Sequence, residues 1–223
     1  NAERPFVEAA AAALAALRPE TRAALTRTGL LMPTLSVLFR ASQRTVKSPR
    51  DYLTGIAHPP VFQAGSLDCA KLVRMAHALN TNDLPPVVLL SVRRETQMIP
   101  DRDFFDSART EQLFDSPLAV ARVFRGAART RTMELHARCR RADARLHWVV
   151  LQGDPAKVTF TPNPTNSALM TLTVAHHAPF ETPVGDKQRI LTSRVDVGVI
   201  AETETTFSLP SVWASTVRLC VGT

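Results

Sequence analysis

Residues 132–139 have the sequence TMELHARC, in which apolar and polar side chains alternate without a break. Met133, Leu135, Ala137 and Cys139 point one way and the residues between them point the other way, as in a half-buried strand. Similar runs recur at residues 146–150, 158–160, 170–174, 195–199 and 212–221. Six or seven short strands over roughly ninety residues, separated by turn residues, predict a β-sandwich and fit no βαβ fold.

The composition is different before about residue 130, where Ala and Leu are common and apolar residues recur at helical spacing. Proline residues punctuate this part, and Gly29 is a natural end for one of its helices. Residues 66–79 form the clearest amphipathic helix, residues 87–92 are a strand or an extended connector, and residues 95–118 are a long loop. The predicted fold class is α+β, with a helical region over 1–125 and an all-β sandwich over 130–223.

The 223 residues include 27 Lys and Arg against 20 Asp and Glu, which gives a net charge of +7. Such an excess attracts nucleic acid, anionic lipid or acidic protein surfaces. The apolar share of 45% argues against wholesale disorder. Three cysteines are too few for a disulfide framework. A Cys139–Cys220 bridge is predicted because both residues fall on expected strands of one domain, and three reduced thiols, including Cys69, are the alternative.

Arginine is concentrated between residues 122 and 145, where eight Arg residues accompany only Glu134 and Asp143 as acidic residues. A solvated face explains such a run, and an interaction surface is the second interpretation. A nucleic-acid platform would interleave aromatic side chains with the arginines, and this run contains only Phe124. Nucleic acid is therefore not the expected partner. The candidate interaction residues are Arg138, Arg140, Arg141 and Arg145.

Two tryptophans fall on expected strands. Trp148 is in phase with Leu146 and Val150, which predicts a core position. Trp213 is out of phase with Val212, so the pattern allows the Trp213 side chain to be exposed. Both fit core fillers better than sugar-stacking platforms, but Trp213 is retained as a candidate interaction residue.

No nucleophile elbow, P-loop, dinucleotide fingerprint or His-Glu-x-x-His helix occurs, so neither catalysis nor a cofactor is expected. Asp101, Asp103 and Asp106 are weak candidates for a divalent metal site, because hard cations prefer several oxygen ligands. The alternative is a solvated acidic loop that Phe104 and Phe105 anchor to the core.

Residues 145–155, with the sequence RLHWVVLQGDP, resemble the second-strand region of PKD-type immunoglobulin-like domains. Residues 193–199 and 207–211 are similar to the last two strands of that family, so the likeness covers about residues 130–221. It implies an immunoglobulin-like, extracytoplasmic sandwich that serves spacing, adhesion or docking. The loop at 140–145 has the sequence RRADAR where the family carries Asp, Asn and Gly, so a calcium role for it is in doubt.

A second likeness is to the C-terminal modules of some large bacterial envelope proteins, where phrases like residues 52–58, YLTGIAH, precede the sandwich. Together these resemblances imply a non-catalytic accessory subunit that docks onto a larger envelope or membrane-associated assembly, in the periplasm or outside the cell. The expected partners are proteins, with an acidic or membrane-proximal surface as a further option. The alternative function is a carbohydrate or acidic-polymer binding module that uses Trp213 and the Arg run. A metal enzyme at Asp101, Asp103 and Asp106 is the third hypothesis.

Overall fold

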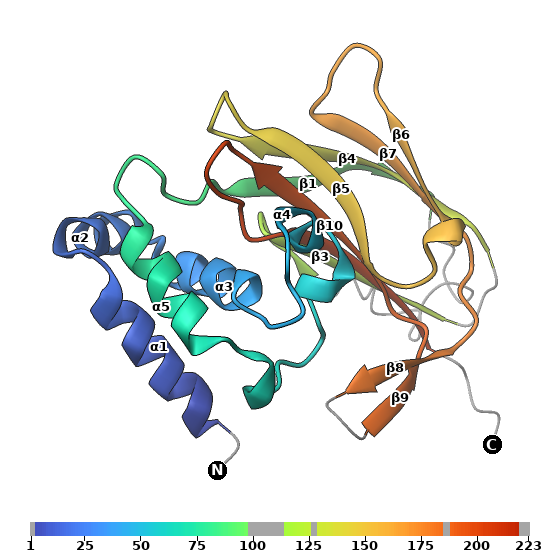
Figure 1. Cartoon of the computed structure of the whole chain (residues 1–223). Coiled ribbons are helices and arrows are strands. Elements are labelled where there is room, and N and C mark those ends of the chain that lie inside the picture. Colours follow the sequence, from blue (N-terminus) through green and yellow to red (C-terminus); the bar gives the residue numbers. More distant parts are fainter. Residues whose placement is uncertain (1–2, 98–113, 126–128, 185–187, 219–223) are drawn as a thin grey trace.

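The computed structural model describes residues 3–97, 114–125, 129–184 and 188–218 of the chain. Within these residues, five α-helices occupy the N-terminal part and three sheets follow (Figure 1). The predicted α+β class is therefore confirmed. The helices gather on one side of the molecule and the larger sheets on the other, with the short helix α4 lying close to strand β10.

Local sequence signals set the ends of the helices. Pro5 lies in the first turn of α1, and Gly29, with φ of 72°, ends α2 in the left-handed conformation that glycine favours. Ser48 and Asp51 form a capping box at α4, and the Asp68 side chain accepts a hydrogen bond from the Lys71 backbone at the start of α5. The helices are α1 (Arg4–Ala16), α2 (Pro19–Thr28), α3 (Leu31–Ala41), α4 (Pro49–Tyr52) and α5 (Cys69–Ala78), with 3-10 turns η1 (Gly55–Ala57), η2 (Ala64–Ser66) and η3 (Pro155–Lys157).

Two larger sheets and one hairpin contain the described strands. The first sheet has the order β1-β4-β7-β6, the second β2-β3-β11-β10-β5, and β8 pairs only with β9. Strand β3 runs parallel to β11, and the other described pairs are antiparallel. The strands are β1 (Val88–Glu95), β2 (Phe114–Asp115), β3 (Ala119–Arg125), β4 (Arg131–Cys139), β5 (Arg145–Gln152), β6 (Val158–Pro162), β7 (Leu169–Val174), β8 (Phe180–Val184), β9 (Gln188–Thr192), β10 (Val195–Glu202) and β11 (Ser211–Arg218).

The sheets draw strands from both sides of the predicted boundary at residues 125–130. Strand β1 pairs with β4, and β3 pairs with β11. The last α-helix of the described residues ends at Ala78 and strand β1 begins at Val88, so the described helical part is shorter than the predicted 1–125 region. The predicted loop at 95–118 ends in strand β2, and its residues 98–113 lie outside the described residues.

One apolar core lies between the two larger sheets. It combines Leu135 and Leu172 of the first sheet with Val197, Val199 and Trp213 of the second, all with at most 1% of their surface exposed. A separate core, which includes Leu25 and Leu72, holds the helices together. The protein therefore has two β-layers with a helical part attached.

The helical part packs on the outer face of the second sheet. Ile200 of β10 is fully buried there with Tyr52 of α4 and Val37 of α3. The Tyr52 hydroxyl donates a hydrogen bond of 3.0 Å to the Ser208 carbonyl. At Gly55, an added Cβ would lie 2.5 Å from the Leu151 carbonyl oxygen, so only glycine permits this approach of η1 to β5.

Candidate functional site

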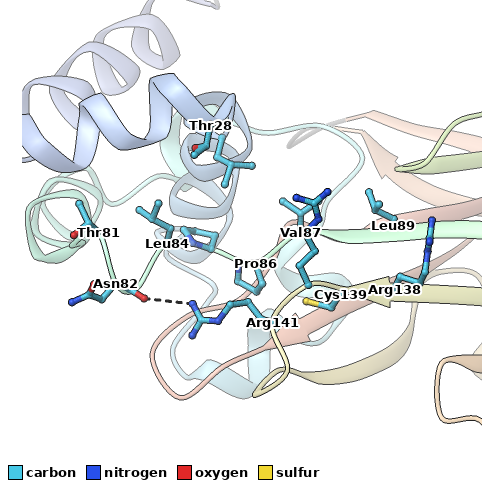
Figure 2. Close-up of a pocket in the computed structure, with 13 residues that line it drawn as sticks. Thr28, Thr81, Asn82, Leu84, Pro86, Val87, Leu89, Arg138, Cys139 and Arg141 are labelled. Atoms are coloured by element: carbon cyan, nitrogen blue, oxygen red, sulfur yellow. Dashed lines mark hydrogen bonds between the residues drawn. The ribbon is translucent and has the colours of Figure 1, made fainter.

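An open groove of about 790 Å³ lies where the helical part meets the first sheet (Figure 2). We call it the junction groove. Its apolar lining is Leu30, Leu84, Pro85, Pro86, Val87 and Leu89. Its polar lining is Thr28, Thr81, Asn82, Arg138, Arg140 and Arg141, and Cys139 completes it. Cavities of this size, at the junction of two structural parts, are typical binding sites.

The pleat of two paired strands supplies one wall of the groove. Leu90 of β1 and Ala137 of β4 point into the core, so their neighbours Leu89 and Arg138 point outward. Leu89 and Arg138 are register partners, which places an apolar and a cationic side chain side by side on the outer face. Figure 2 shows both residues at the sheet end of the groove.

The floor is the connector between α5 and β1. Pro85 and Pro86 are buried, and proline rings fix the backbone φ angle, so this segment is stiff. Leu84 packs against the helical core. The connector begins in a turn where the Asn82 backbone N–H donates to the Asn80 side chain at 2.9 Å. These restraints hold the floor in one shape.

The three arginines of the groove differ in whether they form hydrogen bonds or ion pairs with other residues of the protein. Arg141 donates two hydrogen bonds, of 2.9 and 2.8 Å, to the Asp143 carboxylate, and these lower the pKa of Asp143. Arg141 also donates to the Asn82 carbonyl at 3.4 Å, which ties the β4–β5 turn to the connector. Arg138 and Arg140 are exposed, and neither has an ion pair or hydrogen bond within the described part of the chain. Two guanidinium groups are therefore available to a ligand.

Positive charge continues from the groove along the outer face of the first sheet. A register shift between Val92 and Arg94 places a bulge in β1. At this bulge, Arg93 lies with its Nη2 atom 3.2 Å from Nδ1 of His136. Burial, followed by the charges of Arg93 and Arg138, lowers the pKa of His136 and so favours its neutral form. The outer face beside the groove therefore carries Arg93 and Arg138 on either side of a histidine whose neutral form is favoured.

The structure brings together three of the predicted interaction residues and leaves two apart. Arg138, Arg140 and Arg141 line the groove. Arg145 is exposed at the start of β5 and does not line it. Trp213, retained as a candidate interaction residue, is 1% exposed and belongs to the core between the sheets, so it is no surface platform. Trp148 is half-buried and packs against the same core, with its ring 6.5 Å from that of Phe160.

The predicted metal and disulfide residues lie largely outside the described part of the chain. Asp101, Asp103 and Asp106 are among residues 98–113, and Cys220 is among residues 219–223. Cys69 and Cys139 carry free thiols, and Cys139 is half-buried at the end of β4. Among the described residues, no cluster of three or more His, Cys, Asp or Glu residues suits a metal ion.

A second polar cluster is buried between α4, η1 and the second sheet. His58 is 8% exposed, and its Nε2 lies 2.7 Å from the Tyr52 carbonyl oxygen. Burial, reinforced by the charge of Arg40, lowers the pKa of His58 to about 4. The Arg40 guanidinium lies 5.1 Å from the centre of the Phe62 ring. Tyr52 stacks on Phe207 at 4.8 Å, so this cluster fixes the helical part to the sheet.

Sequence reasoning missed the apolar half of the junction groove. Leu30 and Leu84 are separated by more than fifty residues, and Arg138 follows after a similar interval. The Pro85-Pro86 pair was the available signal, because two prolines before a strand make a stiff extended segment. Comparison of the chain with protein-family models, with curated proteins and with solved structures finds no match. No described helix has the length and apolar character that crossing a membrane requires.

Proposed function

We propose that this protein is a non-catalytic docking subunit of a larger assembly and that the junction groove receives the partner. The observation that carries the proposal is a preformed apolar groove whose rim holds two arginines, Arg138 and Arg140, without a partner among the described residues. Half-buried apolar side chains such as Leu84 and Leu89 beside unpaired arginines are consistent with an interaction site.

The strand order supports an immunoglobulin-like sandwich. In that fold, strands A, B, E and D form one sheet in the order A-B-E-D, and strands C, F and G form the other. The order β1-β4-β7-β6 corresponds to the first sheet, and β5, β10 and β11 correspond to the second. The chain order of these strands also agrees, with β3 added at the edge of β11. This agreement favours the PKD-type resemblance, on which the proposed location in a bacterial envelope assembly rests.

The attachment of the helical part supports a docking role. The Tyr52–Ser208 hydrogen bond and the close approach of Gly55 to Leu151 fix the helices on the second sheet. A groove that is already shaped in the free protein loses little conformational entropy when a partner binds. The helical part therefore serves as one wall of a preformed site.

A protein partner fits the groove better than a carbohydrate. Sugar-binding sites use exposed aromatic rings, and the lining residues of the groove include none. Trp213, the ring that the carbohydrate hypothesis requires, is buried in the core. Arginine is instead enriched at protein interfaces, and three arginines line this groove.

The proposal is tested by the size of the native assembly. The full chain, tagged and isolated from cells that produce it naturally, is expected to sediment as a stoichiometric complex larger than the monomer. Leu89→Lys places a charge in the groove and is expected to release the monomer. Leu191→Lys is the matched control, because Leu191 is 68% exposed on β9 and does not line the groove.

Circular dichroism and thermal unfolding establish that both variants fold. A parent protein that is monomeric under native conditions contradicts the proposal. So does a folded Leu89→Lys variant that keeps the complex intact.

A further inference from the structure

We infer that the junction groove binds an extended peptide segment that combines apolar side chains with carboxylates, supplied by the partner protein. This inference rests on the proposed docking function and specifies the chemistry of the partner. It follows from three properties of the site: an aliphatic floor, unpaired guanidinium groups at its rim, and the two-residue spacing of Arg138 and Arg140 at the end of β4.

The floor selects apolar side chains. Leu84, Pro86, Val87 and Leu89 face the groove from one continuous segment of chain. Pro85 and Pro86 have no backbone N–H, so this segment offers few donors to a polar ligand. The groove volume of about 790 Å³ accommodates several aliphatic side chains. Burying these surfaces supplies affinity without a directional requirement.

The arginines at the rim of the groove favour a ligand that carries negative charge. Arg138 and Arg140 have no ion pair among the described residues, and Arg141 is held in place by Asp143 and the Asn82 carbonyl. Guanidinium groups bind carboxylates through paired hydrogen bonds, which gives orientation as well as attraction. The net charge of +7 also accelerates the approach of an acidic partner.

The spacing along β4 favours an extended ligand. Arg138 and Arg140 both line the groove and are two residues apart at the end of β4, which corresponds to about 6.6 Å in an extended chain. A peptide in extended conformation repeats its own side chains at the same interval. Carboxylates at alternate positions of the ligand therefore meet Arg138 and Arg140 in turn.

Other anionic ligands match the site less well. A single-stranded nucleic acid requires aromatic platforms for its bases, and the described lining has only aliphatic and polar side chains. An anionic lipid surface matches a convex basic face, whereas these arginines border a concave apolar groove. Both ligands are retained as arms of the test.

The test measures binding of the full chain to labelled synthetic peptides by fluorescence anisotropy. The main probe is a peptide of about ten residues with a Leu-Val-Leu block followed by Glu at alternate positions. One comparison peptide replaces each Glu with Lys, and another replaces the apolar block with Ser. An oligothymidylate strand and vesicles of phosphatidylserine and phosphatidylcholine complete the panel.

We expect the main probe to bind at least about tenfold more tightly than every other ligand, with affinity that falls as salt rises. Arg138→Glu and Arg140→Glu are each expected to weaken it by about tenfold or more. Arg145→Glu makes the same charge change in an exposed arginine outside the groove and is the matched control, with an expected change of less than about twofold.

Three results overturn the inference: no preference for the main probe, preferential binding of the oligothymidylate or the vesicles, or equal losses in Arg140→Glu and Arg145→Glu. The native complex separates this failure from that of the proposed function. If Leu89→Lys releases the monomer but the main probe does not bind, the groove is a docking site for a partner of different chemistry. If the native protein is monomeric, the docking function itself fails.

Discussion

Acid is expected to weaken the attachment of the helical part through a single buried histidine. His58 is 8% exposed, and its Nε2–H donates to the Tyr52 carbonyl, because a carbonyl oxygen only accepts. Nδ1 has no hydrogen-bond partner within the described residues. Arg40, the cation that contributes to the low pKa, is close by. Protonation of Nδ1 would therefore place a second positive charge in a buried site where no described residue accepts a hydrogen bond from the new N–H.

The magnitude follows from the two pKa values. The pKa of His58 is about 4 in the folded protein and 6.5 ordinarily, and one pKa unit corresponds to about 1.4 kcal/mol. The unfolded chain takes up the proton first as pH falls, so the stability contribution is complete above pH 6.5 and is lost as pH falls towards 4. The full loss is about 3 kcal/mol, and about 2 kcal/mol of it occurs between pH 8 and pH 5.

The assay is urea unfolding of the parent and of His58→Gln at pH 8 and pH 5. Glutamine keeps a donor near the position of Nε2 but does not titrate, so the variant is expected to lose about 2 kcal/mol less than the parent on acidification. His77→Gln, on the exposed side of α5, controls for the replacement of a histidine as such. The reasoning is refuted if the parent and His58→Gln lose the same free energy of unfolding over this pH interval.

Two further predictions concern packing and are read from the free energy of unfolding. Gly55→Ala is expected to cost about 2 kcal/mol, because its Cβ would lie 2.5 Å from the Leu151 carbonyl oxygen. Gly65→Ala, where nothing lies within 4 Å, is expected to change stability by less than about 0.5 kcal/mol, and equal effects at the two glycines would contradict the contact. Trp213→Ala is expected to cost about 3–5 kcal/mol, because the ring fills the core between the sheets, and a loss below about 1 kcal/mol would contradict its burial.

Strict alternation made strand β4 predictable. Met133, Leu135 and Ala137 are buried, as the alternation of residues 132–139 indicates. Strand β3 was not recognised, because its inward residues include a charge. Arg122 is 2% exposed and forms ion pairs with Glu95 at 3.0 Å and with Asp115 at 2.6 Å. From the sequence alone, an arginine that is buried in such ion pairs looks the same as a surface arginine.

The sequence left the exposure of Trp213 open because polar residues share its face of strand β11. Ser211, Trp213 and Ser215 face inward on β11, whereas the more apolar Val212 and Ala214 are half-buried on the other face. The inward serine at 211 donates a hydrogen bond of 2.6 Å to the Val88 carbonyl, which satisfies a hydroxyl inside the protein. Since small polar residues share the buried face with the tryptophan, hydrophobicity alone points to the wrong side of the strand.

The candidate site was predictable only in its charged half. Arg138, Arg140 and Arg141 stand out as a dense cationic run in one short segment. The apolar half forms only when Leu30 and Leu84 lie close to that segment in space. This proximity depends on how the helices pack against the sheets. Local periodicity contains no information on that placement.

The contact between Gly55 and Leu151 has a consequence for the junction groove, to which neither residue belongs. It anchors the helices to the second sheet, while the junction groove opens between those helices and the first sheet. A side chain at position 55 would collide with the Leu151 carbonyl oxygen, so the contact between the helical part and the second sheet would have to shift. We expect such a shift to alter the spacing between groove residues of the helical part, such as Leu30, and those of the first sheet, such as Leu89.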